Sequence, residues 1–360
     1  MFRETPRRTV TTSRSESELE TGDVMPVLQL GRYPTPVALA TTLSRPGSDL
    51  WIKRDDLTHP VYGGNKVRKL EYLLAGALAR GATRLVTIGA AGSHHVLATT
   101  YFGGRAGLGV EAILVPQPST DHVLEVLRAD VGLGLRAFPV NSWSAVPLAF
   151  ARRVASGAWP ITVGGSSVAG SMGYVQAARE LAAQVREGQL PEPDVCVVAL
   201  GSGGTAAGLA AGFAAEGLKT RVVGACVSGP PWALRLISLS LARACARLAR
   251  VTGGSGGVTM RERLAIDTRF LGAGYGFDVP AGAEAAAAAG EAGLVLDRTY
   301  TAKAFASALW HVRARQARHV LYWHTLSSAP MGPLLEGAPA LAALDPALRR
   351  LALPAAGALR

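Results

Sequence analysis

The sequence predicts an α/β protein whose parallel sheets are covered by helices on both faces. Short, continuously apolar runs alternate along the chain with longer alanine-rich stretches that carry apolar residues at helical spacing. Continuous apolar runs are typical of strands buried on both faces, and strand–helix alternation is typical of parallel sheets. At 360 residues, with 49% hydrophobic and 18% charged residues, the chain is long enough for two globular domains.

Five short apolar runs are predicted to be buried strands, and they lie at residues 84–90, 111–116, 194–200, 221–228 and 319–325. Apolar residues recurring every three to four positions predict helices at residues 66–82, 95–108, 173–188 and 204–217. A further apolar run, 281–296, is interrupted by Glu284 and Glu291, so it predicts a helix followed by a strand and not a membrane span. In such sheets ligands bind where strands end and helices begin, so the loops at those ends are the candidate sites.

The N-terminal end and the overall charge exclude several classes of protein. Residues 1–27 are polar and lack apolar periodicity, and their acidic residues argue against a signal or transit peptide, so we expect a disordered tail. The net charge is +11, but the arginines are scattered without a basic–aromatic stripe, so we expect neither a nucleic-acid nor a membrane partner. Cys196, Cys226 and Cys245 fit no metal spacing, which predicts reduced thiols, a cytoplasmic location and no metal site.

Lysine is rare in this arginine-rich chain and occurs only at positions 53, 66, 69, 219 and 303. Lys66 follows the glycine pair 63–64 and Asn65 at the predicted start of a helix. The positive end of the helix dipole lowers the pKa of an amine placed there, and a partly neutral amine can form an imine or move a proton. A surface lysine is the alternative, and Arg68 and Lys69 are expected on the solvated face of this helix.

A glycine-rich loop follows the strand predicted at 194–200 and leads directly into a helix. Backbone N–H groups and hydroxyls of such a loop can converge on an anion at the positive end of the helix dipole. No lysine follows the glycines as in a P-loop, and their spacing differs from the dinucleotide-binding motif. We therefore predict a phosphate site, with a tight packing turn as the alternative, formed by Gly201, Ser202, Gly203, Gly204 and Thr205.

A second loop follows the first predicted strand and begins a helix with Ser93, His94 and His95. A hydroxyl, two imidazoles and free backbone amides suit a carboxylate. Adjacent histidines cannot share a metal as an i, i+4 pair does, and Ser93 as a plain helix cap is the alternative. Tyr275 lies between glycines and Tyr300 precedes a helix, so each is either an acid or a packing anchor.

Together these loops provide an imine-forming amine, a phosphate site and a carboxylate site. This combination suits pyridoxal 5'-phosphate and an amino-acid substrate, because the cofactor supplies the electron sink while the protein anchors it and moves protons.

The same loops resemble a known family, the fold-type II pyridoxal-phosphate enzymes, in their D-cysteine desulfhydrase and 1-aminocyclopropane-1-carboxylate deaminase branch. The matching motifs occur in family order and cover most of the chain: YPTP (33–36), LWIKRDDL (50–57), GGNKVRKLE (63–71), GSHH (92–95), GGSSVAGSMGYVQAARE (164–180), GSGGTAAGL (201–209), GAGYG (272–276), LDRTYTAKA (296–304) and HT (324–325).

The resemblance implies a role for each matching residue. It makes Lys66 the Schiff-base lysine that also moves the substrate α-proton, and it makes residues 201–205 the phosphate loop. The implied catalytic residues are Lys66, Ser93, Tyr275 and Tyr300; the implied cofactor-binding residues are Lys66, Asn65, His94, Gly201, Ser202, Gly203, Gly204, Thr205 and Thr325; and the implied substrate-binding residues are Ser93, His94, His95, Tyr275 and Tyr300.

Two positions distinguish the branches of the family. Deaminases resemble YEGK, with the glutamate at the pyridine nitrogen, and HLGG, whereas desulfhydrases resemble YTGK and HTGG, with a threonine hydroxyl at that nitrogen. This chain has Thr301 and Thr325 at those positions, which favours the desulfhydrase branch. A neutral hydroxyl partner leaves the ring nitrogen less protonated, which favours elimination over longer-lived carbanion chemistry.

Several positions depart from the family pattern around the expected substrate pocket. The family's QSNH is GSHH here, so His94 replaces an asparagine, and GGSN, HTGG and YTGK become GGSS, HTLS and YTAK. The lysine and the phosphate loop are intact. We therefore expect retained cofactor chemistry with an altered substrate.

The resemblance implies a lyase or deaminase that eliminates a β-substituent from a small amino acid, D-amino acids included, to give an α-keto acid and ammonia. Cyclopropane-ring opening, β-replacement and racemisation are alternatives within the family, and a non-catalytic pyridoxal-phosphate-binding protein is an alternative from another class.

The resemblance also implies a homodimer and a tryptophan synthase β-like architecture with the cofactor in an interdomain cleft. The phosphate loop and both tyrosines are expected in a large domain of residues 28–62 and 165–338. Lys66 and the Ser93 loop are expected in a small domain of residues 63–164. The pattern leaves open the order of residues 339–360.

Overall fold

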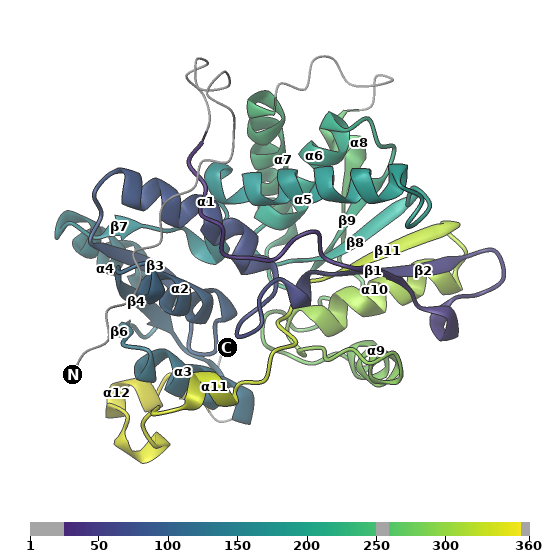
Figure 1. Ribbon diagram of the computed structural model, residues 1–360. Helices are drawn as coiled ribbons and strands as arrows, with labels where there is room; N and C mark the ends of the chain where they lie inside the picture. Colours follow the sequence, from purple (N-terminus) through teal and green to yellow (C-terminus); the bar gives the residue numbers. More distant parts are fainter. Residues whose placement is uncertain (1–24, 250–258, 354–360) are drawn as a thin grey trace, which may run out of the picture.

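The computed structural model describes residues 25–249 and 259–353. Within them the chain forms two helix-covered sheets of six and four strands, together with a separate strand pair. Figure 1 shows the six-stranded sheet on the right and the four-stranded sheet on the left, with the chain crossing between them several times. The predicted tail of residues 1–27 falls largely outside the described residues.

The six-stranded sheet has the strand order β1-β2-β11-β8-β9-β10. Only the edge strand β1 runs antiparallel to its neighbour; the other strand pairs are parallel. The strands are β1 (Val37–Leu39), β2 (Asp49–Arg54), β8 (Val195–Leu200), β9 (Arg221–Cys226), β10 (Leu264–Asp267) and β11 (His319–His324).

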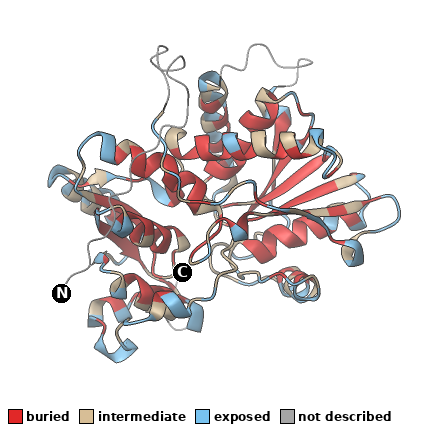
Figure 2. Cartoon of the chain, viewed as in Figure 1, coloured by how far each residue is buried: buried red, intermediate tan, exposed pale blue. Residues whose placement is uncertain are grey.

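Both faces of this sheet are covered, as the continuously apolar strands predict. Along β8, Cys196, Val198 and Leu200 face a core formed with α5, α6 and α7, whereas Val195 and Val197 face a core formed with α9 and α10. Figure 2 shows the strands buried along their central lengths. The covering helices are α5 (Val168–Arg186), α6 (Gly204–Ala215), α7 (Pro231–Leu248), α9 (Pro280–Glu291) and α10 (Thr301–Arg313), with a short α8 (Met260–Arg263) preceding β10.

The four-stranded sheet has the order β6-β4-β3-β7 and is parallel throughout. One face packs against helices α1, α2 and α3, and the other packs against α4. The elements are α1 (Asn65–Ala79), β3 (Arg84–Ala90), α2 (His94–Arg105), β4 (Gly109–Val115), α3 (Asp121–Gly132), β6 (Arg136–Pro139), α4 (Val146–Ala155) and β7 (Trp159–Pro160).

The C-terminal segment returns to the helices of the four-stranded sheet. α11 (Gly332–Leu335) contacts α3, and β12 (Ala352–Leu353) pairs with β5 (Gln117–Pro118). Leu334, Leu344 and Leu348, the last on α12 (Pro346–Arg349), lie in the same core as α2 and α3. The described part of residues 339–360 is therefore folded onto the smaller unit, while the exact domain boundaries stay predictions.

A group of buried charges joins the two units. Arg68 lies on α1, Asp55 directly follows β2, and Glu180 lies on α5. Arg68 donates to both Asp55 carboxylate oxygens at 2.8 and 2.9 Å and to Glu180 Oε2 on α5 at 2.9 Å. Tyr174 donates to Asp55 Oδ2 at 2.7 Å. Because each charge meets an opposite charge and further hydrogen bonds, burial is tolerated.

The α/β class and the parallel sheets are confirmed, and the bounds of the five predicted strands lie within two residues of those of β3, β4, β8, β9 and β11. Two expectations are wrong. No strand follows α9, because the chain from residue 292 passes through a turn directly to α10. Arg68 and Lys69 are not solvated, with exposures of 3% and 2%, because α1 is packed on both sides.

No helix in residues 25–249 or 259–353 combines the length and the apolarity that crossing a membrane requires.

Candidate active site

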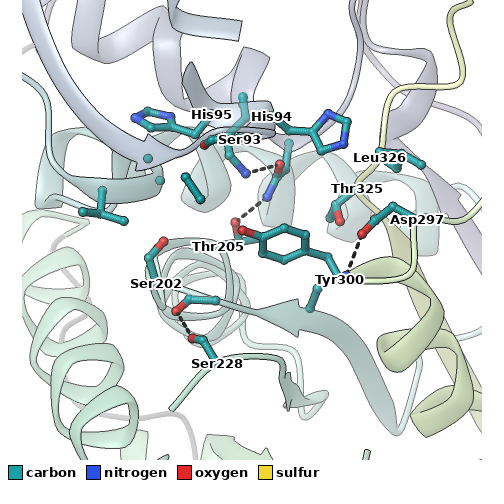
Figure 3. Close-up of a pocket in the computed structure, with 18 of the residues that line it drawn as sticks. Ser93, His94, His95, Ser202, Thr205, Ser228, Asp297, Tyr300, Thr325 and Leu326 are labelled. Carbon is teal, nitrogen blue, oxygen red and sulfur yellow. Dashed lines mark hydrogen bonds between the residues drawn. The ribbon is translucent and has the colours of Figure 1, made fainter. Parts of the chain in front are cut away.

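A cavity of about 400 Å³ opens where strand ends from both sheets meet. β3, β8 and β11 end at Ala90, Leu200 and His324, and the loops that follow these ends line the cavity. This is the position that parallel sheets favour for ligands, because helix N-termini gather there. Figure 3 shows side chains from several such loops pointing into one space.

Lys66 lies at the start of α1 and lines the cavity. Its Nζ donates to Asn65 Oδ1 at 2.8 Å, and Asn65 Nδ2 donates to Thr205 Oγ1 of the glycine-rich loop at 3.1 Å. Burial lowers the pKa of Lys66 to about 8, against a smaller opposing effect of Asp297. The direction of this pKa shift agrees with the sequence prediction, but its cause is burial and not the helix dipole.

The backbone before Lys66 depends on Gly64. Its φ is +90°, in the region that side chains disfavour, and a Cβ there would lie 2.5 Å from the Thr325 carbonyl oxygen. The same carbonyl accepts from Asn65 N at 3.1 Å. The lysine loop is thus held directly against the loop that follows β11.

The glycine-rich loop 201–205 turns from β8 into α6 with Gly203 at a φ of +91°. Gly204 N donates to Ser166 Oγ at 3.1 Å, and the Ser166 and Ser202 hydroxyls are 2.7 Å apart. A Cβ on Gly204 would lie 2.7 Å from Ser166 Oγ. Gly204 therefore lets the loop pack directly against Ser166, while Gly201, Ser202, Gly203 and Thr205 form a cradle that faces the cavity at the N-terminus of a buried helix.

Lys69 belongs to this cradle, which the sequence analysis did not predict. Its Nζ donates to the Gly164 carbonyl at 3.0 Å and to Ser166 Oγ at 3.3 Å. Burial and the nearby Lys66 charge lower the pKa of Lys69 well below its ordinary value. An anion in the cradle would favour its charged form. Lys69 follows Lys66 by three residues, and this spacing puts both amines on one face of the helix. That spacing was the sign in the sequence that Lys69 could belong to the site.

Ser93, His94 and His95 begin α2, as expected, but they make different contacts. Ser93 Oγ accepts from Val96 N at 3.4 Å, so Ser93 caps the helix while lining the cavity. His95 also lines the cavity, and its Nε2 is 2.8 Å from Thr87 Oγ1 on β3. Figure 3 shows the His94 and His95 rings diverging from the helix start.

The two tyrosines meet across the cavity. Tyr300 Oη donates to Tyr275 Oη at 2.9 Å, and the rings are edge-to-face with centroids 5.6 Å apart. Burial raises the pKa of Tyr275 to about 12, and it raises that of Tyr300 well above its ordinary value. Both hydroxyls therefore stay protonated near neutral pH. Because Tyr300 donates its hydroxyl hydrogen to Tyr275, the Tyr275 hydroxyl is the one that can donate to a ligand.

Asp297 is a second cavity residue that the sequence analysis missed. Its carboxylate accepts from Tyr300 N at 2.7 Å, from Thr301 N at 3.1 Å and from Thr301 Oγ1 at 2.6 Å. Asp297 therefore fixes the start of α10 and orients the Thr301 hydroxyl as a donor toward itself. Thr325 also lines the cavity, as predicted.

All predicted site residues except Gly204 line this one cavity, and Gly204 contributes its backbone N–H to the cradle. The arrangement defines an enzyme-like pocket with an amine of lowered pKa, an anion cradle and a helix N-terminus for a second anion. Sites of this composition suit a phosphorylated aldehyde and an amino acid.

The chain belongs to the pyridoxal-phosphate-dependent enzyme family, whose model matches residues 28–325. It is 35% identical over 298 residues to the nocardicin C-9' epimerase of Nocardia uniformis subsp. tsuyamanensis, covering 80% of this chain and 89% of that protein. It is 34% identical over 336 residues to a D-cysteine desulfhydrase of Salmonella paratyphi A, covering 89% and 97%. A crystal structure of an ACC deaminase homologue superposes with a TM-score of 0.74 at 30% identity, covering 87% and 96%.

The predicted fold-type II class and the pyridoxal-phosphate cofactor are therefore confirmed, and the residues fit the cofactor. Gly201, Ser202, Gly203 and Thr205 line the cavity at the N-terminus of α6, and this set of backbone N–H groups and hydroxyls suits a phosphate. Lys66 is the amine that lies in the same cavity with a lowered pKa. The roles of the individual residues stay predictions.

Proposed function

We propose that the protein is a pyridoxal-phosphate-dependent lyase that eliminates a β-substituent from a small amino acid, giving an α-keto acid and ammonia as a desulfhydrase does. Both D- and L-amino acids are candidate substrates. The observation that carries the proposal is the pair Thr301 and Thr325, which lines the cavity with hydroxyls at the two positions where the deaminase pattern has glutamate and leucine. The Salmonella desulfhydrase, at 34% identity, supports it.

When bound, pyridoxal phosphate supplies the electron sink that makes loss of a substrate α-proton and a β-substituent possible. The cradle at 201–205 holds the phosphate, assisted by Ser166 and by the Lys69 amine. Lys66 is the base that takes the proton from the substrate α-carbon, and Asn65 orients its Nζ through the 2.8 Å hydrogen bond.

The N-terminus of α2 binds the substrate carboxylate, because Ser93 and the unpaired backbone amides at the helix start provide donors and a favourable dipole. The hydroxyl pair Tyr275–Tyr300 faces the same cavity and donates to the substrate or its leaving group. Thr301 Oγ1 donates to the Asp297 carboxylate at 2.6 Å and accepts from Asp297 N at 2.7 Å, so Asp297 fixes the position of the Thr301 hydroxyl at the cavity.

Racemisation or epimerisation is a second candidate, because an epimerase of Nocardia is 35% identical to this chain. It requires proton removal and return at the α-carbon without loss of a substituent. Ring opening and β-replacement are less well supported, the former because Thr301 replaces the glutamate of the deaminase pattern. A protein that binds the cofactor without catalysis remains the alternative from another class.

The test is an absorbance titration of the purified holoenzyme with D- and L-forms of cysteine, serine, β-chloroalanine and alanine, and with 1-aminocyclopropane-1-carboxylate. We expect one or more β-substituted amino acids to shift the cofactor band while keto acid and ammonia accumulate. A band that shifts with inversion of the amino acid and no keto acid would establish racemisation instead. A band that responds to no amino acid would contradict an enzymatic role.

We also propose a cytoplasmic location, supported by the three free, buried cysteines Cys196, Cys226 and Cys245, and a homodimer, supported by the family resemblance alone. Light scattering of the purified protein measures the oligomeric state directly.

A further inference from the structure

A continuous hydrogen-bonded chain of side chains leads from the cavity to the surface. Tyr62 Oη is 2.7 Å from His94 Nδ1, and His94 Nε2 is 3.1 Å from His122 Nε2 at the start of α3. His122 Nδ1 is 3.8 Å from a Glu125 carboxylate oxygen. Tyr62 and His94 line the cavity, whereas the His122 and Glu125 side chains are each 44% exposed.

The inner part of this chain is neutral near physiological pH. Burial, and secondarily the neighbouring His122 and Lys66, lower the pKa of His94 to about 4, although Asp297 partly opposes them. Burial raises the pKa of Tyr62 well above its ordinary value. A neutral imidazole has one donor and one acceptor nitrogen, so the three groups can be hydrogen-bonded in either of two opposite directions.

We propose that Tyr62, His94 and His122 form a proton path between the active-site cavity and solvent. The inference rests on the proposed function, because the path exchanges with water the proton that Lys66 takes from the substrate α-carbon. A cofactor and an amino acid would fill much of the cavity and exclude bulk water. A side-chain path then keeps proton exchange open while the cavity is filled.

After a proton has passed along the path, every group on the path has the same net charge as before. In the inward direction His122 takes a solvent proton at Nδ1 and passes its Nε2 proton to His94 Nε2. His94 passes its Nδ1 proton to Tyr62 Oη, whose own hydroxyl hydrogen is donated to the His94 carbonyl at 3.2 Å, and Tyr62 passes that hydroxyl proton to a neutral base in the cavity. One proton enters and one leaves, and each histidine ends with its other nitrogen protonated. The Glu125 carboxylate stabilises His122 while it is transiently protonated.

Alanine in ²H₂O gives a direct test, because it has an α-proton but no β-substituent to eliminate. The holoenzyme is incubated with D- or L-alanine, and loss of the α-¹H signal is followed by NMR. We expect His122→Gln and His94→Asn each to slow exchange about tenfold, since general acid–base groups contribute factors of that size or more. His319→Gln, a substitution of a histidine outside the cavity lining, is the matched control and should leave exchange unchanged.

A second measurement does not depend on catalysis. Long-range ¹H–¹⁵N spectra report which nitrogen of each imidazole carries the proton. We expect the two His94 tautomers to exchange in the wild-type holoenzyme and to collapse to one in His122→Gln. A His94 ring that keeps one tautomer in both proteins would overturn the path.

The two proposals fail differently. If alanine shifts the cofactor band and exchanges its α-proton equally fast in wild type, His122→Gln and His94→Asn, the path is wrong while the proposed function stands. If no amino acid shifts the band, the proposed function is wrong, and the ring spectra alone decide whether the hydrogen-bonded path exists.

Discussion

The two walls of the cavity are held in different ways. The wall that carries Lys66 rests on buried charges: Arg68, Asp55 and Glu180 are joined by paired hydrogen bonds, and α1 is anchored to α5 through them. On the other wall, the His94 ring is held by hydrogen bonds to Tyr62 and to the exposed His122 on α3. The first wall carries Lys66, the proposed Schiff-base lysine, and the second carries His94, which departs from the family pattern.

This difference indicates where the protein can change its substrate without losing its cofactor. A buried ion network tolerates little substitution, because removing one member leaves an unpaired charge in a low dielectric. An exposed side chain such as His122 can be altered at small cost to folding. The largest effects of substitution are therefore expected on the wall that carries Lys66.

Replacing the reactive amine should have the largest effect. We expect Lys66→Ala to lower the rate of keto-acid formation by at least about 10³-fold, because the base and the covalent attachment point are lost together. Steady-state kinetics with the substrate identified by titration measure it. Lys219→Ala, at an exposed lysine, is the control. Full activity of Lys66→Ala would show that another group removes the α-proton.

Breaking the buried network should destabilise the fold. Arg68→Met leaves the carboxylates of Asp55 and Glu180 without their main cation, and we expect the free energy of unfolding to fall by about 3–5 kcal/mol. Denaturant unfolding measures the loss. The matched control is Arg186→Met, which removes a 60% exposed partner of Glu216 and should cost at most about 1 kcal/mol. Equal losses in the two variants would mean that the network does not hold this wall.

Glu71, also on α1, should make stability depend on pH. Burial raises its pKa from 4.5 to about 7, although N–H donors from Leu30 and Gly31 oppose the shift. The folded state thus binds this proton more tightly than the unfolded state does. Its stabilising contribution is present below pH 4.5 and is lost as pH rises through 7, by roughly 3 kcal/mol.

The measurement for Glu71 is the free energy of unfolding of wild type and Glu71→Gln between pH 4.5 and 8. Because glutamine does not titrate, the difference between the two proteins should change across this window, with the wild type losing stability relative to the variant as pH rises. A difference that is constant with pH would contradict a raised pKa at Glu71.

The smallest effect expected on this wall concerns Lys69. Lys69→Met removes one cation beside the phosphate cradle, and charge-assisted hydrogen bonds contribute about 1.5–3 kcal/mol, so cofactor affinity should fall about tenfold to a hundredfold. Fluorescence titration of the apoenzyme with pyridoxal phosphate measures this affinity. Unchanged affinity would place the Lys69 amine outside the phosphate site.

Local patterns in the sequence were sufficient for much of the fold and of the site. The strands β3, β4, β8, β9 and β11 follow from continuous apolar runs, and the glycine-rich loop and the start of α2 follow from residue types at strand ends. These features depend on neighbours in sequence, so periodicity and turn chemistry reveal them. Lys66 was identified because its helix-start position and its rarity are both visible in the chain.

Other features were decided only by the tertiary structure. Lys69 and Arg68 were expected on a solvated face, yet packing of α1 between α2 and α5 buries both. Asp297 and Ser166 enter the site because loops distant in sequence converge there. His122 is 28 residues from His94, and nothing local relates them. Sequence periodicity determines which face of a helix is apolar, but the partners that cover the remaining faces are set by how the two sheets pack together.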